Sequence, residues 1–461
     1  MGGLGMRVAS LARHLNPANG MNISGRMAWA AACLLTASAC GPDQTAAREN
    51  PAQPKADAEA SAQASQDASI LINLKRGQLA DYGATPWYTE DLAVGTSPMR
   101  FALDSGTKLL WATSDQCSTA ACNAHDKVNT SQPGFSWVQQ PQPPQEVHFG
   151  PWGSMGVWIG KAPFVQSSAS LSTPLTFFAS VDYEGEKFQH LAWGGGIGFP
   201  SESKSVTQTG FYFKALVDSG AVGASYSVYT DASSGTGAFI LGAPDTSKYD
   251  PSTAVRLPPK KNSNPDLNYL WGTLLTDVQI AGTSLPPLQN QIFYLDTGSS
   301  RFKGDDTYVY PIMNQLLEYK DSQGNDIFVK YSETVQGKLT WTGLQYGSGG
   351  PADYPNLPDL SLTLGDTCGQ QQGKQLMISL SPDQYSYKVD VGDRQGDWVV
   401  AVHRLDQVGG LLVGSTFMDL IYAAFTYERN SDDSLSQGDM MLFKTNQGIQ
   451  PSGYQCVDAN G

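Results

Sequence analysis

Two short stretches decide the fold of this chain: residues 103–107 have the sequence LDSGT, and residues 295–299 have the sequence LDTGS. In each stretch the aspartate directly follows an apolar run, residues 101–103 in the first case and 292–295 in the second. A carboxylate that ends an apolar strand and enters a glycine turn is partly dehydrated yet accepts hydrogen bonds. Two such carboxylates facing each other share one proton, because like charges that close cannot both ionise. The duplication therefore predicts a paired-carboxylate site, which can activate water and cut peptide bonds without a metal.

Length and composition indicate a mostly β protein. The 461 residues exceed a single typical core of about 250–300 residues, so two lobes are expected. The 48 glycines, the 27 prolines and short runs of Thr, Ser, Tyr and Val favour strands and tight turns. Short apolar alternations predict strands at residues 70–74, 239–242, 275–280, 360–364 and 398–402. Helices are expected to be few and short, and the best candidate is residues 308–319.

The charge of the chain argues against nucleic acid as a partner. The formal net charge is -14 at pH 7. Three basic residues, Arg7, Arg13 and Arg26, precede residue 39, so the rest of the chain is more acidic still. Such a surface repels a phosphate backbone.

The N-terminus is typical of an export signal. Arg26 precedes an apolar stretch, residues 27–39, that ends in small residues directly before Cys40. This pattern resembles the bacterial lipoprotein lipobox, in which the cysteine is lipidated and becomes the mature N-terminus. We expect residues 1–39 to be a signal peptide and Cys40 to anchor the protein to a bacterial membrane, in the periplasm or cell envelope. The alternative is an ordinary secretory signal cleaved near Ala39, with Cys40 incidental.

The segment after Cys40 has the composition of a tether. Residues 40–69 are rich in Ala, Gln, Asp, Ser, Glu and Pro, with almost no large apolar side chains, so they cannot form a core. We expect a disordered, lipidated segment that holds the folded part away from a membrane surface.

The cysteines fit an exported protein. The chain has six cysteines, of which one lies in the signal segment and Cys40 would carry the lipid. The remaining even number suits an oxidising compartment, and we expect disulfides between Cys117 and Cys122 and between Cys368 and Cys456. The second pair joins distant points and could instead be two free thiols. No histidine lies at ligand spacing and there is no HExxH, so neither a metal nor a cofactor is expected.

Ordered landmarks surround the two turns. The first half contains residues 104–111, Cys117, Cys122, His125, residues 149–156 and residues 195–200. The second half contains residues 270–275, 357–360 and 411–417. In this order and spacing, the chain resembles the pepsin-like aspartic proteases from about Trp87 to the C-terminus. The resemblance implies an all-β, bilobal fold with few short helices, in which residues 70–232 form the N-terminal lobe and residues 233–461 the C-terminal lobe.

A third Asp-Ser-Gly copy provides a control within the same chain. Residues 218–220 lie where the family has a connecting loop. Since most turns of this kind are plain turns, we interpret Asp218 as a surface residue.

The resemblance implies roles for the first residues of each turn. Asp104 and Asp296 would be the catalytic pair that activates the attacking water. Ser105 and Thr297 would cross-link the two loops through their hydroxyls and hold the carboxylates near one plane.

The other turn residues would complete the site. Thr107 and Ser299 would donate hydrogen bonds to the outer carboxylate oxygens. Gly106 and Gly298 would allow close backbone approach, while their amides stabilise the charge. Both aspartates come from one chain, so a monomer is expected. Its partner would be a protein or peptide substrate, bound extended across the cleft.

The flap hairpin departs from the family's pattern. The family usually places a tyrosine at its base, hydrogen-bonded to a tryptophan. Here Trp111 is present, but the matching residue is Phe149, which has no hydroxyl. One extra residue, Pro151 or Trp152, is inserted, and we expect the indole of Trp152 to fill the same space. The alternative is that the flap is only a structural hairpin.

The main functional hypothesis is an exported endopeptidase that uses paired aspartates and prefers apolar side chains around the cleaved bond. The family's zymogens carry a basic pro-segment, whereas the region before the fold is acidic here, so no long pro-segment is expected. The alternative is a catalytically inactive pepsin-like binding or inhibitor protein, which the altered flap permits. A surface-anchored β-rich adhesin would require the landmark series to be a coincidence.

Overall fold

The computed structural model describes residues 68–149, 152–166, 171–185, 187–287, 291–335 and 338–459. The predicted signal peptide, Cys40 and nearly all of the predicted tether lie outside these ranges and stay predictions. Within the described ranges, no helix combines the length and the apolar character that crossing a bilayer requires.

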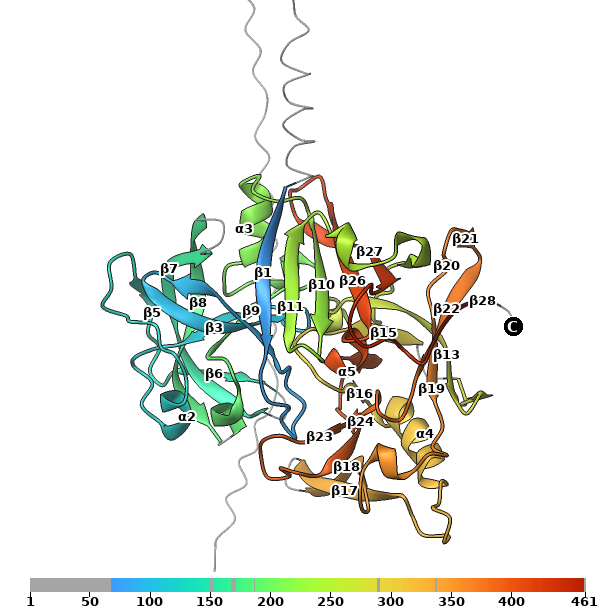
Figure 1. Ribbon diagram of the computed structural model, residues 1–461. Helices are drawn as coiled ribbons and strands as arrows, with labels where there is room; N and C mark the ends of the chain where they lie inside the picture. The colour runs from blue at the N-terminus through green and yellow to red at the C-terminus, as the bar shows by residue number, and fades with distance from the viewer. Residues whose placement is uncertain are drawn as a thin grey trace, which may run out of the picture. The chain divides into compact units, whose positions relative to one another are not determined.

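The described residues fold mostly as strands, which form two sheets (Figure 1). The strands before residue 250 are β1 (Ser69–Arg76), β2 (Trp87–Val94), β3 (Ser97–Asp104), β4 (Leu110–Thr113), β5 (Ser136–Gln139), β6 (Gln145–His148), β7 (Ser154–Gln166), β8 (Leu171–Glu184), β9 (Gly195–Gly198), β10 (Ser225–Asp231) and β11 (Thr236–Gly242). The later strands are β12 (Val255–Leu257), β13 (Gly272–Ile280), β14 (Thr283–Ser284), β15 (Ile292–Leu295), β16 (Phe302–Gly304), β17 (Phe328–Val335), β18 (Lys338–Tyr346), β19 (Leu360–Leu364), β20 (Thr367–Cys368), β21 (Gln371–Gln372), β22 (Lys374–Leu380), β23 (Ser386–Lys388), β24 (Trp398–Arg404), β25 (Leu411–Val413), β26 (Ile421–Arg429), β27 (Leu435–Lys444) and β28 (Gly453–Asp458). The predicted strands lie within β1, β11, β13, β19 and β24 and are confirmed.

Helices are short, as expected. The described α-helices are α2 (Ala120–Asn123), α3 (Tyr212–Asp218), α4 (Asp306–Leu317) and α5 (Ser415–Met418). The short 3-10 helices are Lys187–His190, Ser203–Ser205, Thr246–Lys248, Pro251–Thr253, Pro265–Leu267 and Pro351–Asp353. The helix predicted at residues 308–319 is α4, which begins and ends two residues earlier. Ile312 and Leu316 give it a buried face, in agreement with their helical spacing.

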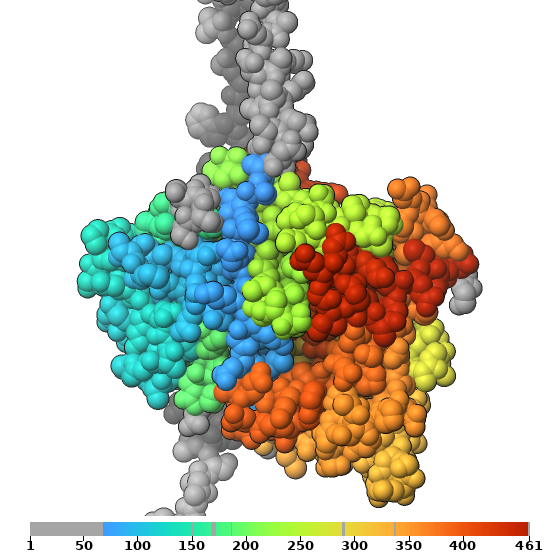
Figure 2. All heavy atoms as spheres, viewed as in Figure 1, coloured from blue at the N-terminus to red at the C-terminus, as the bar shows by residue number. Residues whose placement is uncertain are grey.

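The first sheet contains β1, the first strand, together with the late strands β26 and β27. It has sixteen strands in the order β21-β20-β12-β27-β26-β10-β11-β1-β2-β3-β9-β4-β8-β7-β5, with β6 beside β7. Figure 2 shows the segment containing β1 (blue) and the segment containing β10 and β11 (yellow-green) between the earlier strands and the late, red part of the chain. The predicted lobe boundary, between residues 232 and 233, falls in the turn of the β10–β11 hairpin, and the boundaries stay predictions.

The second sheet carries the second Asp turn. It has twelve strands in the order β17-β18-β24-β16-β25-β15-β13-β19-β22-β28, with β14 beside β13 and β23 beside β24. All of its strands come from the second half of the chain.

Alternating hydropathy explains why these segments pair as strands. In β1, Ile70, Ile72 and Leu74 are buried, whereas Leu71 and Asn73 between them are exposed. A strand with this period buries one face and leaves the other in solvent. The buried face of β1 belongs to the large apolar core, which also includes Leu103 and Leu295, the residues directly before the two aspartates.

The strands that lead into and out of the two Asp turns are arranged alike. β3 runs parallel to β9, with Asp104 beside Gly198, and β15 runs parallel to β25, with Leu295 beside Val413. After the first turn, β4 pairs antiparallel with β9. After the second turn, β16 pairs antiparallel with β25 in the same way. β4 is then parallel to β8, and β16 is parallel to β24. The duplication in the sequence is therefore also a duplication of structure.

Both predicted disulfides are present. Cys117–Cys122 closes a short loop after β4. Cys368–Cys456 links β20 to β28 across 88 positions, so the alternative of two free thiols is wrong. Two structural disulfides are typical of proteins that fold in an oxidising compartment.

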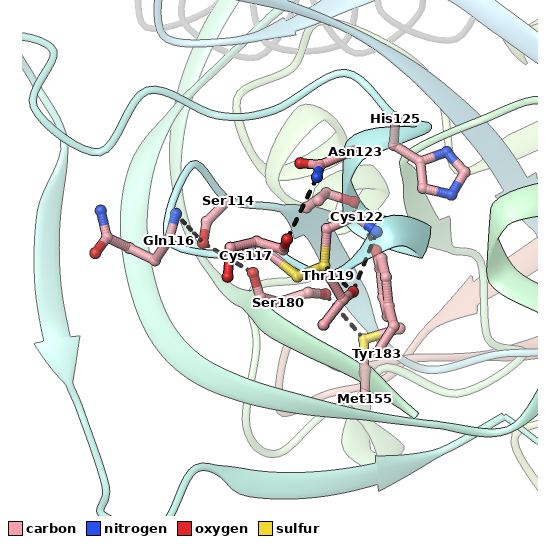
Figure 3. The surroundings of a disulfide bond; sticks show 12 residues. Ser114, Gln116, Cys117, Thr119, Cys122, Asn123, His125, Met155, Ser180 and Tyr183 are labelled. Carbon is pink, nitrogen blue, oxygen red and sulfur yellow. Dashed lines mark hydrogen bonds between the residues drawn. A yellow bond between two sulfur atoms is a disulfide. The ribbon is translucent and has the colours of Figure 1, made fainter. Parts of the chain in front are cut away.

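The short disulfide loop is fastened to the strands behind the flap hairpin (Figure 3). Ser114 Oγ donates to the Ser180 carbonyl oxygen of β8 at 2.8 Å. The Ser180 hydroxyl in turn lies 3.0 Å from the Met155 sulfur of β7. Through Ser180, the loop is therefore linked to the start of β7, near the turn of the hairpin formed by β6 and β7.

Candidate active site

The two Asp turns face each other and are cross-linked by reciprocal hydrogen bonds. The Ser105 N–H donates to Thr297 Oγ1, and the Thr297 N–H donates to Ser105 Oγ, each at 2.9 Å. Ser105 Oγ donates onward to the Leu295 carbonyl oxygen at 3.0 Å. Thr297 Oγ1 donates to the Leu103 carbonyl oxygen at 2.7 Å. Each hydroxyl therefore binds the backbone of the opposite loop, as the resemblance implies.

The glycines of the turns lie against the opposite carboxylates. The Gly106 N–H donates to Asp104 Oδ1 at 2.7 Å, and the Gly298 N–H donates to Asp296 Oδ1 at 2.8 Å. A Cβ atom at Gly106 would stand 2.4 Å from Asp296 Oδ1, and one at Gly298 would stand 2.1 Å from the carboxyl carbon of Asp104. Only glycine fits at these two positions, and the close approach brings the two carboxylates together.

The electrostatics of the pair favour one shared proton. Asp296 is 6% exposed, and Asp104 keeps partial contact with solvent. Burial, the like charge of Asp296 and a hydrogen bond with Asp296 raise the pKa of Asp104 well above its ordinary value. The Gly106 N–H and the Lys303 ammonium oppose this rise in the pKa. Two carboxyl groups this closely coupled titrate as a unit.

The two remaining hydroxyls have hydrogen bonds within their own segments. Thr107 Oγ1 accepts from the Leu109 N–H at 3.4 Å. Ser299 Oγ accepts from Lys303 Nζ at 3.0 Å. Donation by Thr107 and Ser299 to the outer carboxylate oxygens stays a prediction.

The aromatic residues assigned to the flap and cleft lie together. The ring centroids of Trp111 and Phe149 are 5.5 Å apart, and Phe149 stacks on Trp152 at 5.9 Å. Trp152 is 8% exposed and also packs on Trp193 at 5.1 Å. The Phe149 N–H donates to the Gly153 carbonyl oxygen at 2.8 Å and closes the hairpin, whose Gly150 and Pro151 lie outside the described residues. Ring packing thus joins Phe149 to Trp111, where the family has a tyrosine.

A hollow of about 720 Å³ lies beside the hairpin. Trp152 and Gly153 line one part of it, and Tyr82, Glu333 and His403 line another. Neither Asp104 nor Asp296 is among the residues that line this hollow.

Sequence reasoning missed two buried cations that follow the second turn. Arg301 is fully buried, and Lys303 is 5% exposed. Arg301 donates to the hydroxyls of Tyr331, at 2.8 Å, and Tyr387. Lys303 Nζ donates to Ser299 Oγ and to the Gly83 carbonyl oxygen, each at 3.0 Å.

A comparison of the two copies could have found these cations. The fifth and seventh residues after the aspartate are Leu109 and Trp111 in the first copy, but Arg301 and Lys303 in the second. A charged residue at a position that is apolar in a structural duplicate is a signal of a buried charge.

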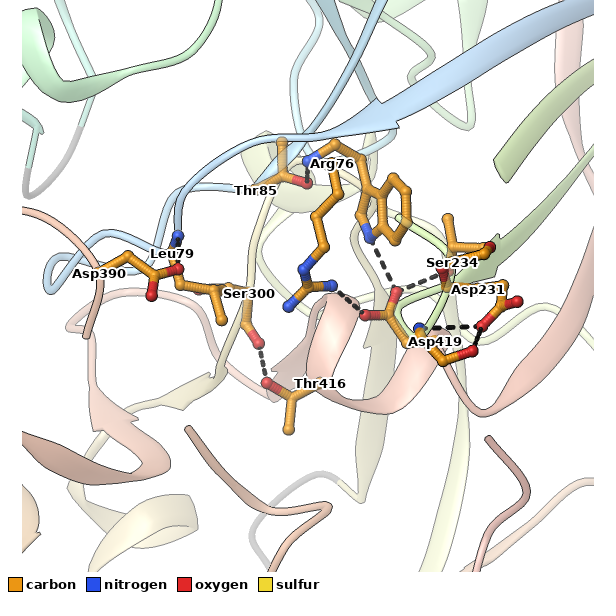
Figure 4. A network of polar contacts seen from close by, with 12 residues as sticks. Arg76, Leu79, Thr85, Asp231, Ser234, Ser300, Asp390, Thr416 and Asp419 are labelled. Carbon is orange, nitrogen blue, oxygen red and sulfur yellow. Dashed lines mark hydrogen bonds and ion pairs between the residues drawn. The ribbon is translucent and has the colours of Figure 1, made fainter. Parts of the chain in front are cut away.

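A further buried carboxylate lies next to the loops of the site. Asp419, which follows α5, accepts hydrogen bonds from Arg76 Nη1 at 3.1 Å, Trp87 Nε1 at 2.9 Å and Thr230 Oγ1 at 2.6 Å (Figure 4). It therefore links the end of β1 to the segment that follows β25. The strand β25 pairs with β15, which leads into the second Asp turn.

The third Asp-Ser-Gly copy lies on the surface, as predicted. Asp218 ends α3 with a side chain that is 41% exposed. It pairs with Lys214 at 2.5 Å and with Arg429 at 3.0 Å.

The facing Asp turns and the two-sheet fold define a protein of the aspartic protease class. Residues 87–433 match the family model described as eukaryotic aspartyl protease, and the chain belongs to this family.

Curated relatives match shorter stretches. The chain is 27% identical to gastricsin of Oryctolagus cuniculus over 168 residues, which cover 35% of this chain and 42% of the relative. It is 29% identical to embryonic pepsinogen of Gallus gallus over 118 residues, 25% of this chain and 30% of the relative. It is 26% identical to an aspartic protease of Phaffia rhodozyma over 146 residues, 31% of this chain and 34% of the relative. The chain thus spans less than half the length of each of these relatives.

The cross-link between the turns predicts a measurable loss of stability. Ser105→Ala leaves the Leu295 carbonyl and the Thr297 N–H without their partner in a buried place. We expect the free energy of unfolding in urea to fall by about 1–3 kcal/mol. Ser233→Ala, at an exposed serine, is the control and should change it by less than about 0.5 kcal/mol. Equal changes in the two variants would show that the cross-link contributes nothing.

Proposed function

We propose that this protein is an exported aspartic endopeptidase that hydrolyses peptide bonds with a water molecule held between Asp104 and Asp296. The observation that carries the proposal is the reciprocal cross-link of Ser105 and Thr297. It sets two carboxylates from distant parts of the chain against each other, which is the arrangement that general acid–base hydrolysis by paired carboxyl groups requires.

The hydrolysis can be written with one proton shared by the carboxyl groups of Asp104 and Asp296 at the start. The ionised carboxylate takes a proton from water while the water oxygen attacks the peptide carbonyl carbon. The protonated carboxyl donates its proton to the carbonyl oxygen, which would otherwise carry a negative charge. Collapse of the tetrahedral intermediate breaks the C–N bond. The carboxyl that took the proton from water gives it to the leaving nitrogen, a hydroxyl of the intermediate returns its proton to the other carboxylate, and the pair regains its starting state. The raised pKa of Asp104 favours this residue as the proton holder.

The substrate would be a protein or peptide in extended conformation. The aromatic cluster of Trp111, Phe149 and Trp152 favours apolar side chains near the cleaved bond. The hollow beside the hairpin offers room for neighbouring side chains. Both carboxylates come from one chain, which supports a monomer as the active form.

Export supports the same function. The two disulfides fit an oxidising compartment, and the pattern before Cys40 fits a lipid anchor in a bacterial envelope. An anchored protease would act on proteins outside the cytoplasm.

Cleavage of a denatured protein at pH 3 to 7, with and without a statine-type aspartic protease inhibitor, tests the proposal. We expect fragments that the inhibitor suppresses. A well-folded protein that gives no fragments over this range would contradict the proposal and favour a pepsin-like binding or inhibitor protein, with the Phe149 flap as the reason.

A further inference from the structure

A buried lysine stands next to the paired carboxylates. Lys303 lies in β16, at the position that Trp111 occupies in β4 of the first half. Trp111 is the register partner of Phe178, and Lys303 is the register partner of His403. The two positions are equivalent in the duplicated structure. The first half has the indole ring of Trp111 there, and the second half has the ammonium group of Lys303. Lysine is almost never buried in this way unless a negative charge compensates it.

The direct hydrogen-bond partners of Lys303 are neutral. Its Nζ donates to the Gly83 carbonyl oxygen and to Ser299 Oγ. Burial lowers the pKa of Lys303 to about 8. The charge of Arg301 adds to this decrease in the pKa, and the charges of Asp296 and Asp104 oppose it. Lys303 therefore carries its charge at acidic and neutral pH, and the pair supplies the compensating negative charge.

The other charged groups near Lys303 compensate one another. His403 Nε2 lies 2.9 Å from Glu333. Burial lowers the pKa of His403 to about 4, so this imidazole is neutral above that pH. Against the opposing effect of burial, the hydrogen bond with His403 and the charges of His403 and Arg301 lower the pKa of Glu333 to about 2. Glu333 thus compensates Arg301.

Lys303 and the aspartate pair therefore remain as the cation and the negative charge that interact with each other at this site. The titratable and charged groups around Lys303 come from the two Asp turns, from the residue before β16, and from β17, β23 and β24: Asp104, Asp296, Arg301, Tyr331, Glu333, Tyr387 and His403.

We propose that Lys303 is the built-in counter-ion of the catalytic pair, which stabilises the single negative charge of Asp104 and Asp296 and so sets the pH range of cleavage. The proposal rests on the proposed function. Lys303 is a positioning residue, because it acts on the pair through Ser299 and through space. A nearby cation favours the ionised form of a carboxyl group, and the Lys303 ammonium opposes the rise in the pKa of Asp104. Removing it moves the active range to higher pH.

The pH dependence of kcat/KM tests this proposal on the purified protein. We expect both limbs of the bell-shaped profile to move up by about one pH unit in Lys303→Met. Lys303→Arg keeps the charge and should stay near the wild-type profile. Lys330→Met, at an exposed lysine of β17, is the matched control and should not move either limb. Active wild-type protein with unmoved limbs in Lys303→Met would overturn the proposal, whereas absence of cleavage by the wild type would overturn the proposed function itself.

Thermal unfolding near pH 5.5 gives a second test that needs no activity. Asp104→Asn combined with Asp296→Asn removes both carboxyl groups and with them the negative charge, which leaves the Lys303 ammonium uncompensated, so the Tm of this double variant should lie below that of the wild type. Adding Lys303→Met to the double variant should recover much of the lost Tm. If Lys303→Met alone fails to fold, this comparison decides. A triple variant no more stable than the double variant, or one that does not fold, overturns the proposal.

Discussion

Asp104→Asn and Asp296→Asn are each expected to lower kcat/KM for peptide cleavage by about 10³-fold or more. An amide keeps the size of the carboxyl group but can neither take a proton from water nor share one with its neighbour. The two turns act as one unit, so either substitution should remove most of the activity and the double variant should lose little more.

Asp218→Asn is the matched control for these two variants. It changes the same residue type in an Asp-Ser-Gly sequence like that of Asp104, but on the surface at the end of α3. Its kcat/KM should equal that of the wild type within a factor of about two. If Asp218→Asn lost activity as the other two variants do, or if either of those stayed active, the assignment of the catalytic pair would be wrong.

Asp419→Ala is expected to lower the free energy of unfolding by about 3–5 kcal/mol. Asp419 is buried and accepts hydrogen bonds from Arg76, Trp87 and Thr230. Alanine leaves the guanidinium and two further donors without their acceptor between β1 and α5. Urea unfolding of the purified protein measures the loss.

Two further variants serve as comparisons for Asp419→Ala. Burial raises the pKa of Asp419, so the neutral Asp419→Asn should lose clearly less stability than Asp419→Ala. Asp218→Ala removes a carboxylate from two exposed ion pairs and should change the free energy of unfolding by less than about 1 kcal/mol. Similar losses at Asp419 and Asp218 would show that the buried network is not a main source of stability.

The sequence predicts those parts of the fold that depend on local pattern. The alternation in residues 70–74 indicates β1, and the spacing of Ile312 and Leu316 indicates α4, because strand and helix periods differ. The two Asp turns were also found from sequence, since each is a short motif behind an apolar run.

Contacts between distant residues could not be predicted in this way. Arg76 and Asp419 are separated by 343 positions, and no local pattern around either one names the other. The partners of Lys303 depend on the register between β16 and β24, which only the folded sheet defines. Its position after the second turn is visible in the sequence, but its burial becomes apparent only when the two copies are compared.

The flap shows how a departure from the family pattern is accommodated. Phe149 cannot donate the hydrogen bond of a tyrosine, yet its ring packs between Trp111 and Trp152. The structure thus holds the hairpin by aromatic contact, and it places Trp152 against Trp193.

Calorimetric titration with a statine-type inhibitor tests most directly whether the two turns form one site. We predict one inhibitor molecule per chain for the wild type and for Asp218→Asn, and binding at least about 10²-fold weaker in both Asp104→Asn and Asp296→Asn. Unweakened binding in either of those two variants would contradict a single site built from both carboxylates.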